Sequence, residues 1–246
     1  TEMKIDKVTG TLIRTGVPSI ANPDDMAGIE EALKLKEKYQ AHLTAITMGP
    51  PQAEDMLREL LARGVDEVVL LSDMKFAGAD TWATSTTLAA FLKTLPYDLI
   101  IAGRQAIDGD TAQVGPQVAE KLGIPQVTYV EEVIDYKDGI LTLKKAYEEY
   151  SEILEVKTPA LISTLNTMNT PRMMNVTDVW NAFDKPIRKV TFADLHLPDN
   201  QVGLKGSPTQ VKKTFTRTLQ ANALKTDLSA EDAAKLIATY LSAYME

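Results

Sequence analysis

Cysteine is absent from this 246-residue chain, and histidine occurs only twice. Without cysteine there is no disulfide, no thiol nucleophile and no cysteine-ligated metal, and two imidazoles are too few for a His-rich metal site. No apolar run approaches the roughly 20 residues that a membrane-spanning helix requires, so we expect no membrane span. The chemistry must therefore come from a bound cofactor, from carboxylates or from backbone groups.

Basic residues are in the minority. The chain has 26 Lys and Arg against 34 Asp and Glu, which gives a formal net charge of -8 and argues against a nucleic-acid partner. With 44% hydrophobic and 24% charged residues, 12 Pro and 13 Gly, the composition is that of an ordinary soluble globular protein. The length corresponds to one large domain or to a domain with extensions.

Short apolar runs alternate with helical patterns through the first half of the chain. Residues 43–48, 67–71 and 98–102 have the composition of buried strands, whereas 23–38, 52–63, 80–94 and 112–122 have helical periodicity. Gly64 and Gly123 are the expected stops of two helices. This alternation predicts an α/β fold with a parallel sheet covered on both faces. Such sheets bind ligands beyond the carboxyl ends of their strands.

The pattern becomes antiparallel after Gly123. Extended segments at 126–135, 140–145 and 149–157 are joined by tight connections, with Asp138-Gly139 as a turn signal, and 159–164 predicts a further strand. We expect a small hairpin at 3–14, an irregular region at 165–208 with a short helix at 177–183, an extended segment at 210–220, and a last helix capped by Ser229. The predicted units are an α/β domain over 1–205 and a C-terminal arm over 206–246.

The most informative segment is 102–117, AGRQAIDGDTAQVGPQ, which follows a predicted strand and opens a predicted helix. Gly109 and Gly115 permit close backbone approach, Thr111 offers a hydroxyl, and the amides of the first helical turn offer donors to a phosphate. Carboxylates repel phosphates unless they cap the helix or contact a ribose, so we assign Asp110 as a cap and leave Asp108 open. The motif is neither GxxxxGK[ST] nor GxGxxG. A loop that merely connects strand to helix is an equally good interpretation of these residues alone.

Two further loops are expected at the same edge of the sheet. They are 48–51, MGPP, and 76–85, FAGADTWATS. Thr81 and Thr84 have hydroxyls that could donate hydrogen bonds to a heteroaromatic ring, but Ser and Thr at a helix start more often serve only as caps.

Together with NPDD at 22–25 and TPALISTLNTMNTPR at 158–172, these segments closely resemble the small (beta) subunits of electron-transferring flavoproteins, which include the FixA-type proteins. The resemblance implies a parallel-sheet, adenine nucleotide alpha-hydrolase-like (Rossmann-like) core and a heterodimer with a larger flavin-binding alpha subunit. It also implies that the C-terminal arm and its helix reach onto alpha. The cofactor contacts that follow are Asn22, Pro23, Asp24, Asp25, Met48, Thr81, Thr84, Arg104, Ala106, Ile107, Asp108, Gly109, Asp110, Thr111, Ala112, Gln113, Val114, Gly115, Pro116 and Gln117.

The version of the loop at Asp108–Pro116 resembles that of the electron-bifurcating members. In that group a second FAD occupies the beta site, accepts hydride from NADH, and passes one electron to ferredoxin or flavodoxin and one through the alpha FAD to an acyl-CoA dehydrogenase. The alternatives are a housekeeping flavoprotein with structural AMP, and a stand-alone adenine-nucleotide sensor. In both flavoprotein hypotheses the flavin performs the redox chemistry, so no side chain need be catalytic and no metal is expected. We expect a cytoplasmic protein.

Three expectations concern the rest of the chain. The resemblance places the dehydrogenase-docking loop at Pro171–Val176, where exposed methionines would suit an adaptable surface and core-filling methionines are an equal alternative. His42 and His196 are expected at the surface without a catalytic role. Family members begin with a central strand and a Pro-Asp-bearing loop before the hairpin, so we expect roughly a dozen residues to precede Thr1, the length of a strand plus a loop.

Overall fold

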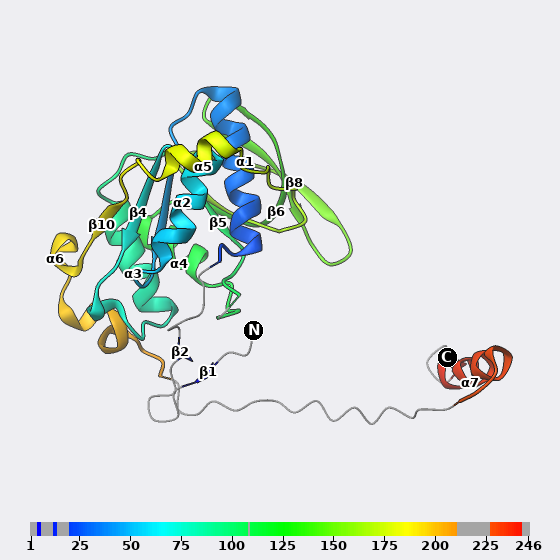
Figure 1. Cartoon of the computed structure of the whole chain (residues 1–246). Coiled ribbons are helices and arrows are strands. Elements are labelled where there is room, and N and C mark those ends of the chain that lie inside the picture. Colours follow the sequence, from blue (N-terminus) through cyan, green and yellow to red (C-terminus); the bar gives the residue numbers. More distant parts are fainter. Residues whose placement is uncertain (1–3, 6–11, 14–19, 108, 211–226, 243–246) are drawn as a thin grey trace. The chain divides into compact units, whose positions relative to one another are not determined.

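The computed structural model describes residues 4–5, 12–13, 20–107, 109–210 and 227–242. Two compact units, Thr1–Lys212 and Lys213–Glu246, divide the chain. Figure 1 shows the first unit as a layered α/β body. Asp108 and all but the first residue of the extended segment predicted at 210–220 lie outside the described residues, whereas the predicted N-terminal hairpin is confirmed by the antiparallel pair β1 (Lys4–Ile5) and β2 (Leu12–Ile13).

A three-stranded parallel sheet forms one half of the core. Its order is β10 (Arg188–Val190), β4 (Glu67–Leu71) and β3 (Thr44–Met48). Alternate residues of β4 point to opposite faces, as the pleat requires. Val68 and Leu70 pack with Leu57 and Leu61 of helix α2 (Ala53–Arg63), while Val69 and Leu71 join a second cluster on the other face. The predicted burial of this strand on both faces is confirmed.

A five-stranded mixed sheet forms the other half, in the order β5 (Leu99–Gly103), β9 (Ala160–Thr164), β6 (Gln126–Lys137), β7 (Ile140–Ala146) and β8 (Ser151–Lys157). Strand β9 is parallel to both of its neighbours, β5 and β6. Strand β7 is antiparallel to both of its neighbours, β6 and β8. Asp138 and Gly139 both have positive φ in the predicted two-residue turn. Among the described strands, β3 and β5 are not hydrogen-bonded to each other, and their side chains Ile46 and Ile100 pack in one cluster.

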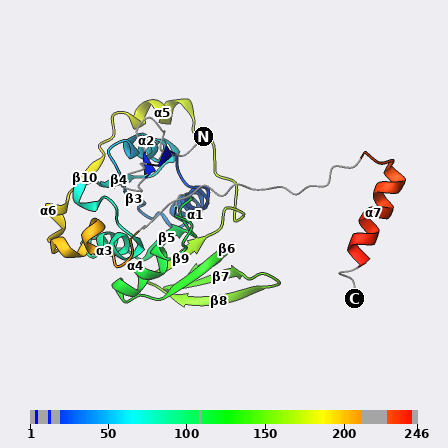
Figure 2. The same ribbon diagram turned by 90° about the horizontal axis from the view of Figure 1, so that it is seen from below.

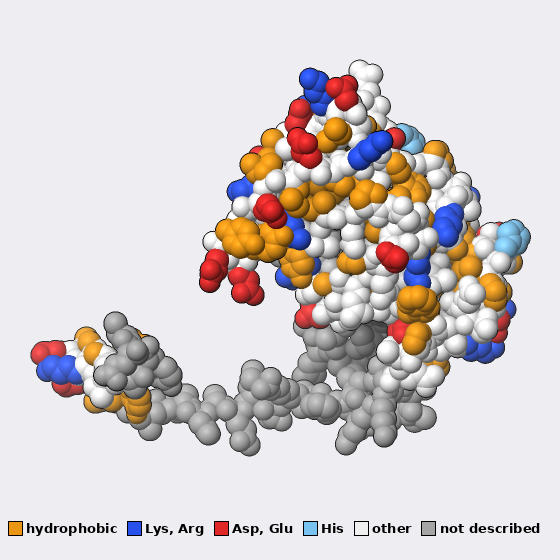
Figure 3. Space-filling view, turned by 180° about the vertical axis from the view of Figure 1, so that it is seen from behind, with side chains coloured by type: hydrophobic (Ala, Val, Ile, Leu, Met, Phe, Trp, Pro, Cys, Tyr) orange, Lys and Arg blue, Asp and Glu red, His pale blue; other side chains and the backbone are white. Residues whose placement is uncertain are grey.

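The antiparallel excursion extends beyond the helices that cover the parallel strands, as Figure 2 shows. The β7–β8 hairpin ends in Tyr147 and Tyr150, whose rings stack at 4.7 Å. Figure 3 shows hydrophobic and acidic side chains together at a protruding end of the molecule on this side.

Helices surround these strands. Besides α2 they are α1 (Pro23–Tyr39), α3 (Thr81–Leu92), α4 (Val114–Leu122), α5 (Val176–Ala182) and the one-turn α6 (Phe192–Leu195), with 3-10 turns at Met74–Phe76, Asp199–Gln201 and Gly203–Gly206. Gly64 and Gly123 terminate α2 and α4 in the left-handed conformation, as predicted. The α/β class with a Rossmann-like parallel core is thus confirmed.

Two predictions of local structure are wrong. Helix α4 begins at Val114 rather than at residue 112, because Ala112 has a φ of 53° and cannot continue a right-handed helix. The region 165–208 is more regular than expected, since Arg188–Val190 pairs in parallel with Val69–Leu71. A three-residue strand is too short to produce a periodic pattern.

The second unit contains helix α7 (Ala230–Ser242). The Ser229 hydroxyl accepts a hydrogen bond from the Asp232 amide at 3.2 Å, which confirms the predicted cap. Within the part of the chain that the structure describes, no helix combines the length and apolarity that a membrane crossing demands.

Candidate functional site

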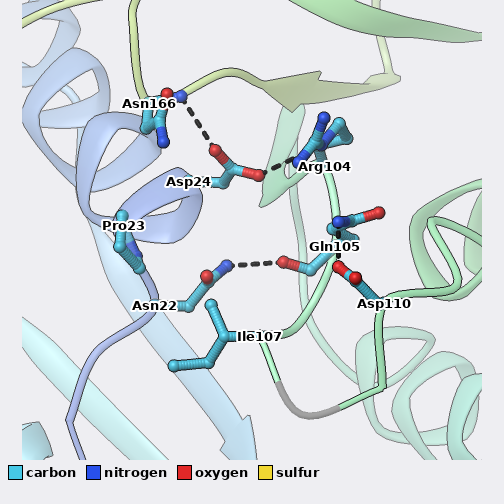
Figure 4. Close-up of a pocket in the computed structure, with 8 residues that line it drawn as sticks. All are labelled: Asn22, Pro23, Asp24, Arg104, Gln105, Ile107, Asp110 and Asn166. Atoms are coloured by element: carbon cyan, nitrogen blue, oxygen red, sulfur yellow. Dashed lines mark hydrogen bonds and ion pairs between the residues drawn. The ribbon is translucent and has the colours of Figure 1, made fainter. Parts of the chain in front are cut away.

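A polar pocket of about 180 Å³ lies beyond the carboxyl ends of the neighbouring strands β5 and β9, against the first turn of α1 (Figure 4). This is the edge at which parallel sheets bind ligands. The residues that line it come from three segments: Asn22, Pro23 and Asp24 at the start of α1; Arg104, Gln105, Ile107 and Asp110 after β5; and Asn166 after β9.

Hydrogen bonds made by the side chains of Asn22 and Asp25 join the start of α1 to the end of β5. Asn22 occupies the N-cap position without capping the helix, and its side-chain amide donates instead to the Gln105 carbonyl at 2.7 Å and to the Asp25 carboxylate at 2.9 Å. The Gly103 amide donates to the other Asp25 oxygen at 2.5 Å. A Cβ on Gly103 would lie 2.6 Å from the Asp25 nitrogen, so only glycine permits this approach.

Asp24 is the centre of the second set of contacts. It is only 5% exposed, and one carboxylate oxygen accepts from the Asn166 amide at 2.9 Å. The other lies 3.3 Å from Arg104 Nε (Figure 4). That nitrogen is buried and has no hydrogen-bond partner, so the contact is an ion pair without hydrogen-bond geometry. The ion pair engages Nε, so the terminal nitrogens of Arg104 keep donor capacity for an anion in the pocket.

The loop from Arg104 to Gln113 folds back on itself. The amides of Gly109 and Asp110 both donate to the Ala106 carbonyl, and Asp110 and Ala112 have left-handed backbone conformations. Asp110 accepts a hydrogen bond from the Gln105 side chain. The N-cap of α4 is Gln113, and Asp110 makes no capping contact with it, so the prediction that Asp110 caps this helix is wrong.

A separate polar network links α3 to α4. The Thr81 hydroxyl donates to Gln113 Oε1 at 2.9 Å and accepts from the Gln117 side chain at 3.3 Å, and the Ser85 hydroxyl donates to Gln117 Oε1 at 2.9 Å. The cap of α3 is Asp80, whose carboxylate accepts from the Ala83 amide. The capping role considered for Thr81 and Thr84 therefore belongs to Asp80.

The pocket brings together only part of the predicted set. Asn22, Pro23, Asp24, Arg104, Ile107 and Asp110 line it, and Asp25 stands directly behind it. Met48 packs instead with a core cluster around Val69 and Phe91. The other predicted residues do not line this pocket: Thr81, Thr84, Ala106, Gly109, Thr111, Ala112, Gln113, Val114, Gly115, Pro116 and Gln117.

Two lining residues, Gln105 and Asn166, were not predicted. Asn166 lies two residues beyond the strand predicted at 159–164, and the rule that ligands bind at carboxyl ends would have indicated it. Gln105 stands inside the segment AGRQ and carried no signal of its own. Both histidines are exposed as predicted, and His42 faces Asp66 and Glu67 at 3.7 and 3.8 Å.

The donor set fits the polar part of a nucleotide. Arg104, the side-chain amides of Gln105 and Asn166, and nearby backbone amides supply donors, while Asn22, Asp24 and Asp110 already have partners within the protein. The volume is below the roughly 300 Å³ at which pockets for whole drug-sized ligands begin, so the pocket accommodates one portion of such a molecule. No group of three or more metal-ligating side chains occurs among the residues described.

Comparisons with known proteins connect this architecture to one family. Residues 9–195 match the electron transfer flavoprotein domain. The chain is 52% identical over 240 residues to the electron transfer flavoprotein subunit beta of Clostridium acetobutylicum, covering 98% of this chain and 92% of that protein. It is 49% identical to subunit CarD of the caffeyl-CoA reductase-Etf complex of Acetobacterium woodii, with 87% and 82% covered. It is 38% identical to protein FixA of Bradyrhizobium diazoefficiens, with 96% and 85% covered. The chain therefore belongs to the electron transfer flavoprotein family, and within it to the beta subunits.

Proposed function

We propose that this beta subunit serves an electron-bifurcating flavoprotein and holds FAD in the pocket and along the loop from Arg104 to Gln117. When bound, FAD accepts a hydride from NADH and releases the two electrons singly, one to ferredoxin or flavodoxin and one through the alpha-subunit FAD to an acyl-CoA dehydrogenase. The observation that carries the proposal is Arg104, a guanidinium held by an ion pair with Asp24 beside a polar pocket at a strand end.

The protein's own groups bind and orient the cofactor. Arg104 supplies charge-assisted hydrogen bonds to an anionic group, and Asp24 limits its orientation by ion pairing. The left-handed residues Asp110 and Ala112 turn successive amides of the loop, an arrangement that suits anions. The network of Thr81, Gln113 and Gln117 fixes the first turn of α4 against α3 and places hydroxyl and amide groups near the loop.

The alternative is a housekeeping flavoprotein in which AMP occupies the same pocket without redox function. Counting cofactors in the purified alpha-beta heterodimer separates the two. Two FAD per heterodimer supports the proposal, whereas one FAD and one AMP would refute it. Stopped-flow mixing with NADH gives an independent answer, because the heterodimer should be reduced within the enzyme's turnover time in the first case and stay oxidised in the second. The relatives favour either flavoprotein over a stand-alone nucleotide sensor.

The partner of α7 is proposed to be the alpha subunit. Its apolar side chains recur at helical spacing, and Ile237, Tyr240 and Leu241 are each more than half exposed. Such a stripe needs a covering surface. We expect Ile237→Asp to weaken alpha-beta association about tenfold or more, because a charge would enter an apolar contact. Thr239→Asp, on the opposite side of the helix, is the matched control, and equal loss of association in both variants would contradict this placement.

The acyl-CoA dehydrogenase is proposed to dock on an exposed apolar surface, which we define as Met173, Val176, Trp180 and Phe183. These side chains are 90%, 87%, 77% and 68% exposed and stand on or beside α5. Met174 points inward and packs with the core cluster of α2 and β4. Of the two alternatives for these methionines, Met173 is therefore the exposed one and Met174 fills the core. A relative named for a caffeyl-CoA reductase-Etf complex supports an acyl-CoA partner.

A further inference from the structure

The exposed apolar surface is held from beneath by charged residues that have no evident role in the pocket. Immediately before Met173, Arg172 turns back to helix α1. Its backbone amide donates to Glu30 Oε2 at 2.9 Å, its Nε lies 3.0 Å from the same oxygen, and its Nη2 donates to Glu30 Oε1 at 3.1 Å. Nη1 reaches Glu37, one further exposed acid of α1. We call Glu30, Glu37 and Arg172 the Arg172 cluster.

Because Glu30 is buried, its carboxylate requires hydrogen-bond partners within the protein. Glu30 is only 6% exposed, and a buried carboxylate is stable only when its oxygens are paired. Both oxygens are paired here, through the fork of one guanidinium and through the amide of the same residue. Because the amide takes part, the carboxylate fixes the course of the main chain at Arg172 as well as its side chain.

The neighbouring contacts hold the same segment by its backbone. Arg63 Nη1 donates to the Arg172 carbonyl, and Arg58 Nη1 donates to the carbonyls of Ala182 at 2.8 Å and Lys185 at 3.0 Å. The Asn169 side-chain amide donates to the Ala27 carbonyl at 3.0 Å. None of these hydrogen bonds uses the side chains of the exposed apolar surface, although the Arg58 guanidinium also lies over the Phe183 ring, 5.9 Å from its centroid.

Helix α1 connects this segment to the pocket. Asp24 in its first turn accepts the Asn166 amide, and Glu30, six residues later, accepts the Arg172 amide. The two ends of the stretch 166–172 are therefore bound to one helix, whose first residues line the pocket. A helix of this length is stiff compared with a loop, so the distance from the pocket to Met173 is fixed by contacts with α1.

We propose that Glu30 and Arg172 are positioning residues for the electron-transfer partner, because they hold the exposed apolar surface in one orientation and in fixed register with the cofactor pocket. The inference rests on the proposed docking of an acyl-CoA dehydrogenase at that surface. A partner that binds Met173 and Trp180 gains affinity when the main chain that carries them is already ordered. Loss of the cluster should thus weaken docking without altering the cofactor.

The test uses the alpha-beta heterodimer and an acyl-CoA dehydrogenase that the unmodified heterodimer reduces. Glu30→Gln removes the charge and retains the shape, and we expect the KM for the dehydrogenase to rise about tenfold, the equivalent of one hydrogen bond to a charged group. The kcat at saturating dehydrogenase and the flavin content should stay within twofold of the unmodified protein. Glu120→Gln, at an exposed acid of α4 that belongs to neither region, is the matched control and should leave KM unchanged.

Two further variants keep the outcome decisive. Arg172→Lys retains the charge and loses the fork, so it should give a smaller rise in KM, and it serves if Glu30→Gln does not fold. The double variant Met173→Ala, Trp180→Ala tests the docking surface itself. If the double variant raises KM and the cluster variants do not, the positioning role is refuted while docking stands. If the double variant leaves KM unchanged, the docking proposal fails and this inference fails with it.

Discussion

The pocket and the exposed apolar surface are built in opposite ways. In the pocket, side chains at the start of α1 contact the loops that follow β5 and β9: Asp24 pairs with the Arg104 side chain and accepts from the Asn166 backbone amide, and the Asn22 side chain donates to the Gln105 carbonyl. At the exposed apolar surface the side chains of Met173, Val176, Trp180 and Phe183 point to solvent, while α1 and α2 hold the backbone beneath them. The same α1 serves both regions.

Because of this difference, substitutions in the two regions should have different effects on the stability of the fold and on the binding of a partner. A substitution in the pocket removes contacts between elements, so it should lower both the stability of the fold and the affinity for a cofactor. A substitution among the exposed apolar side chains removes no intramolecular hydrogen bond or buried contact, so it should change partner binding alone. The following predictions test that contrast, beginning with the largest effect.

Gly103→Val should be the most damaging substitution. The added Cβ would lie 2.6 Å from the Asp25 nitrogen and 2.7 Å from its Oδ1, so β5 and α1 must separate. We expect a loss of about 3 kcal/mol in the free energy of unfolding, the upper range for overpacking, together with loss of the beta-site cofactor. Urea unfolding and cofactor analysis of the heterodimer measure the two effects.

Gly109→Ala is the matched control for this prediction. No atom lies within 4 Å of a Cβ at Gly109, so the substitution should change the unfolding free energy by less than about 0.5 kcal/mol. Any loss of cofactor in this variant would then report contact with the ligand rather than damage to the protein. Equal destabilisation by both substitutions would contradict the tight contact between Gly103 and Asp25.

Arg104→Met should lower the affinity for the cofactor, and it should also lower the stability of the fold because it leaves the buried Asp24 carboxylate without its ion-pair partner. Arg104 has a buried Nε without a hydrogen-bond partner, and its side chain is about one-third exposed, so it contributes more donor capacity than packing. We expect the affinity of the beta-site cofactor to fall about tenfold or more, since a hydrogen bond to a charged group contributes about 1.5–3 kcal/mol. Equilibrium dialysis of the heterodimer measures it. Arg104→Lys, which keeps the charge, should retain part of the affinity. If Arg104→Met bound the cofactor as tightly as the unmodified protein, Arg104 would not belong to the cofactor site.

Strand and helix periodicity predicted most of the fold, and the positions of the loops at one edge of the sheet followed from it. Glu67–Leu71 coincides with its predicted strand, and α1 differs from its prediction by one residue. The failures have local causes. Asp110 is assigned as a helix cap from the repulsion between a carboxylate and a phosphate, but the left-handed turn at Ala112 moves the start of α4 past it. The Glu30–Arg172 contact spans 142 residues, and no local pattern encodes which distant arginine a buried glutamate will meet.

The pH dependence of stability tests the Arg172 cluster. Burial alone would raise the pKa of Glu30, but the hydrogen bonds from the Arg172 side chain and amide outweigh it and lower this pKa below the ordinary glutamate value. A lowered pKa in the folded state means that the stabilisation is fully present above about pH 4.3, the ordinary value, and is lost as the pH falls through the lower folded value.

Glu30→Gln cannot titrate, so its comparison with the unmodified protein isolates this contribution. The difference in unfolding free energy between the two proteins should be constant from pH 8 to 5 and should shrink as the pH falls toward 3, because the contact between the Glu30 carboxylate and Arg172 is lost when Glu30 is protonated. Urea unfolding at pH 6, 5, 4 and 3 provides the measurement. A difference that grew on acidification would show that the pKa of Glu30 is raised instead.

Met173→Ser should have the smallest effect on the isolated protein and so completes the contrast. The side chain is 90% exposed, whereas Met174 beside it packs with the core of α2 and β4. We expect Met173→Ser to change the unfolding free energy by less than about 0.5 kcal/mol and Met174→Ser to lower it by about 2 kcal/mol, since a partly buried methionine loses apolar contacts. Urea unfolding of the two variants side by side decides the point. If Met173→Ser proved as destabilising as Met174→Ser, then Met173 would contribute to the stability of the fold. The exposed apolar surface would then not consist of solvent-exposed side chains on a backbone that α1 and α2 hold in place.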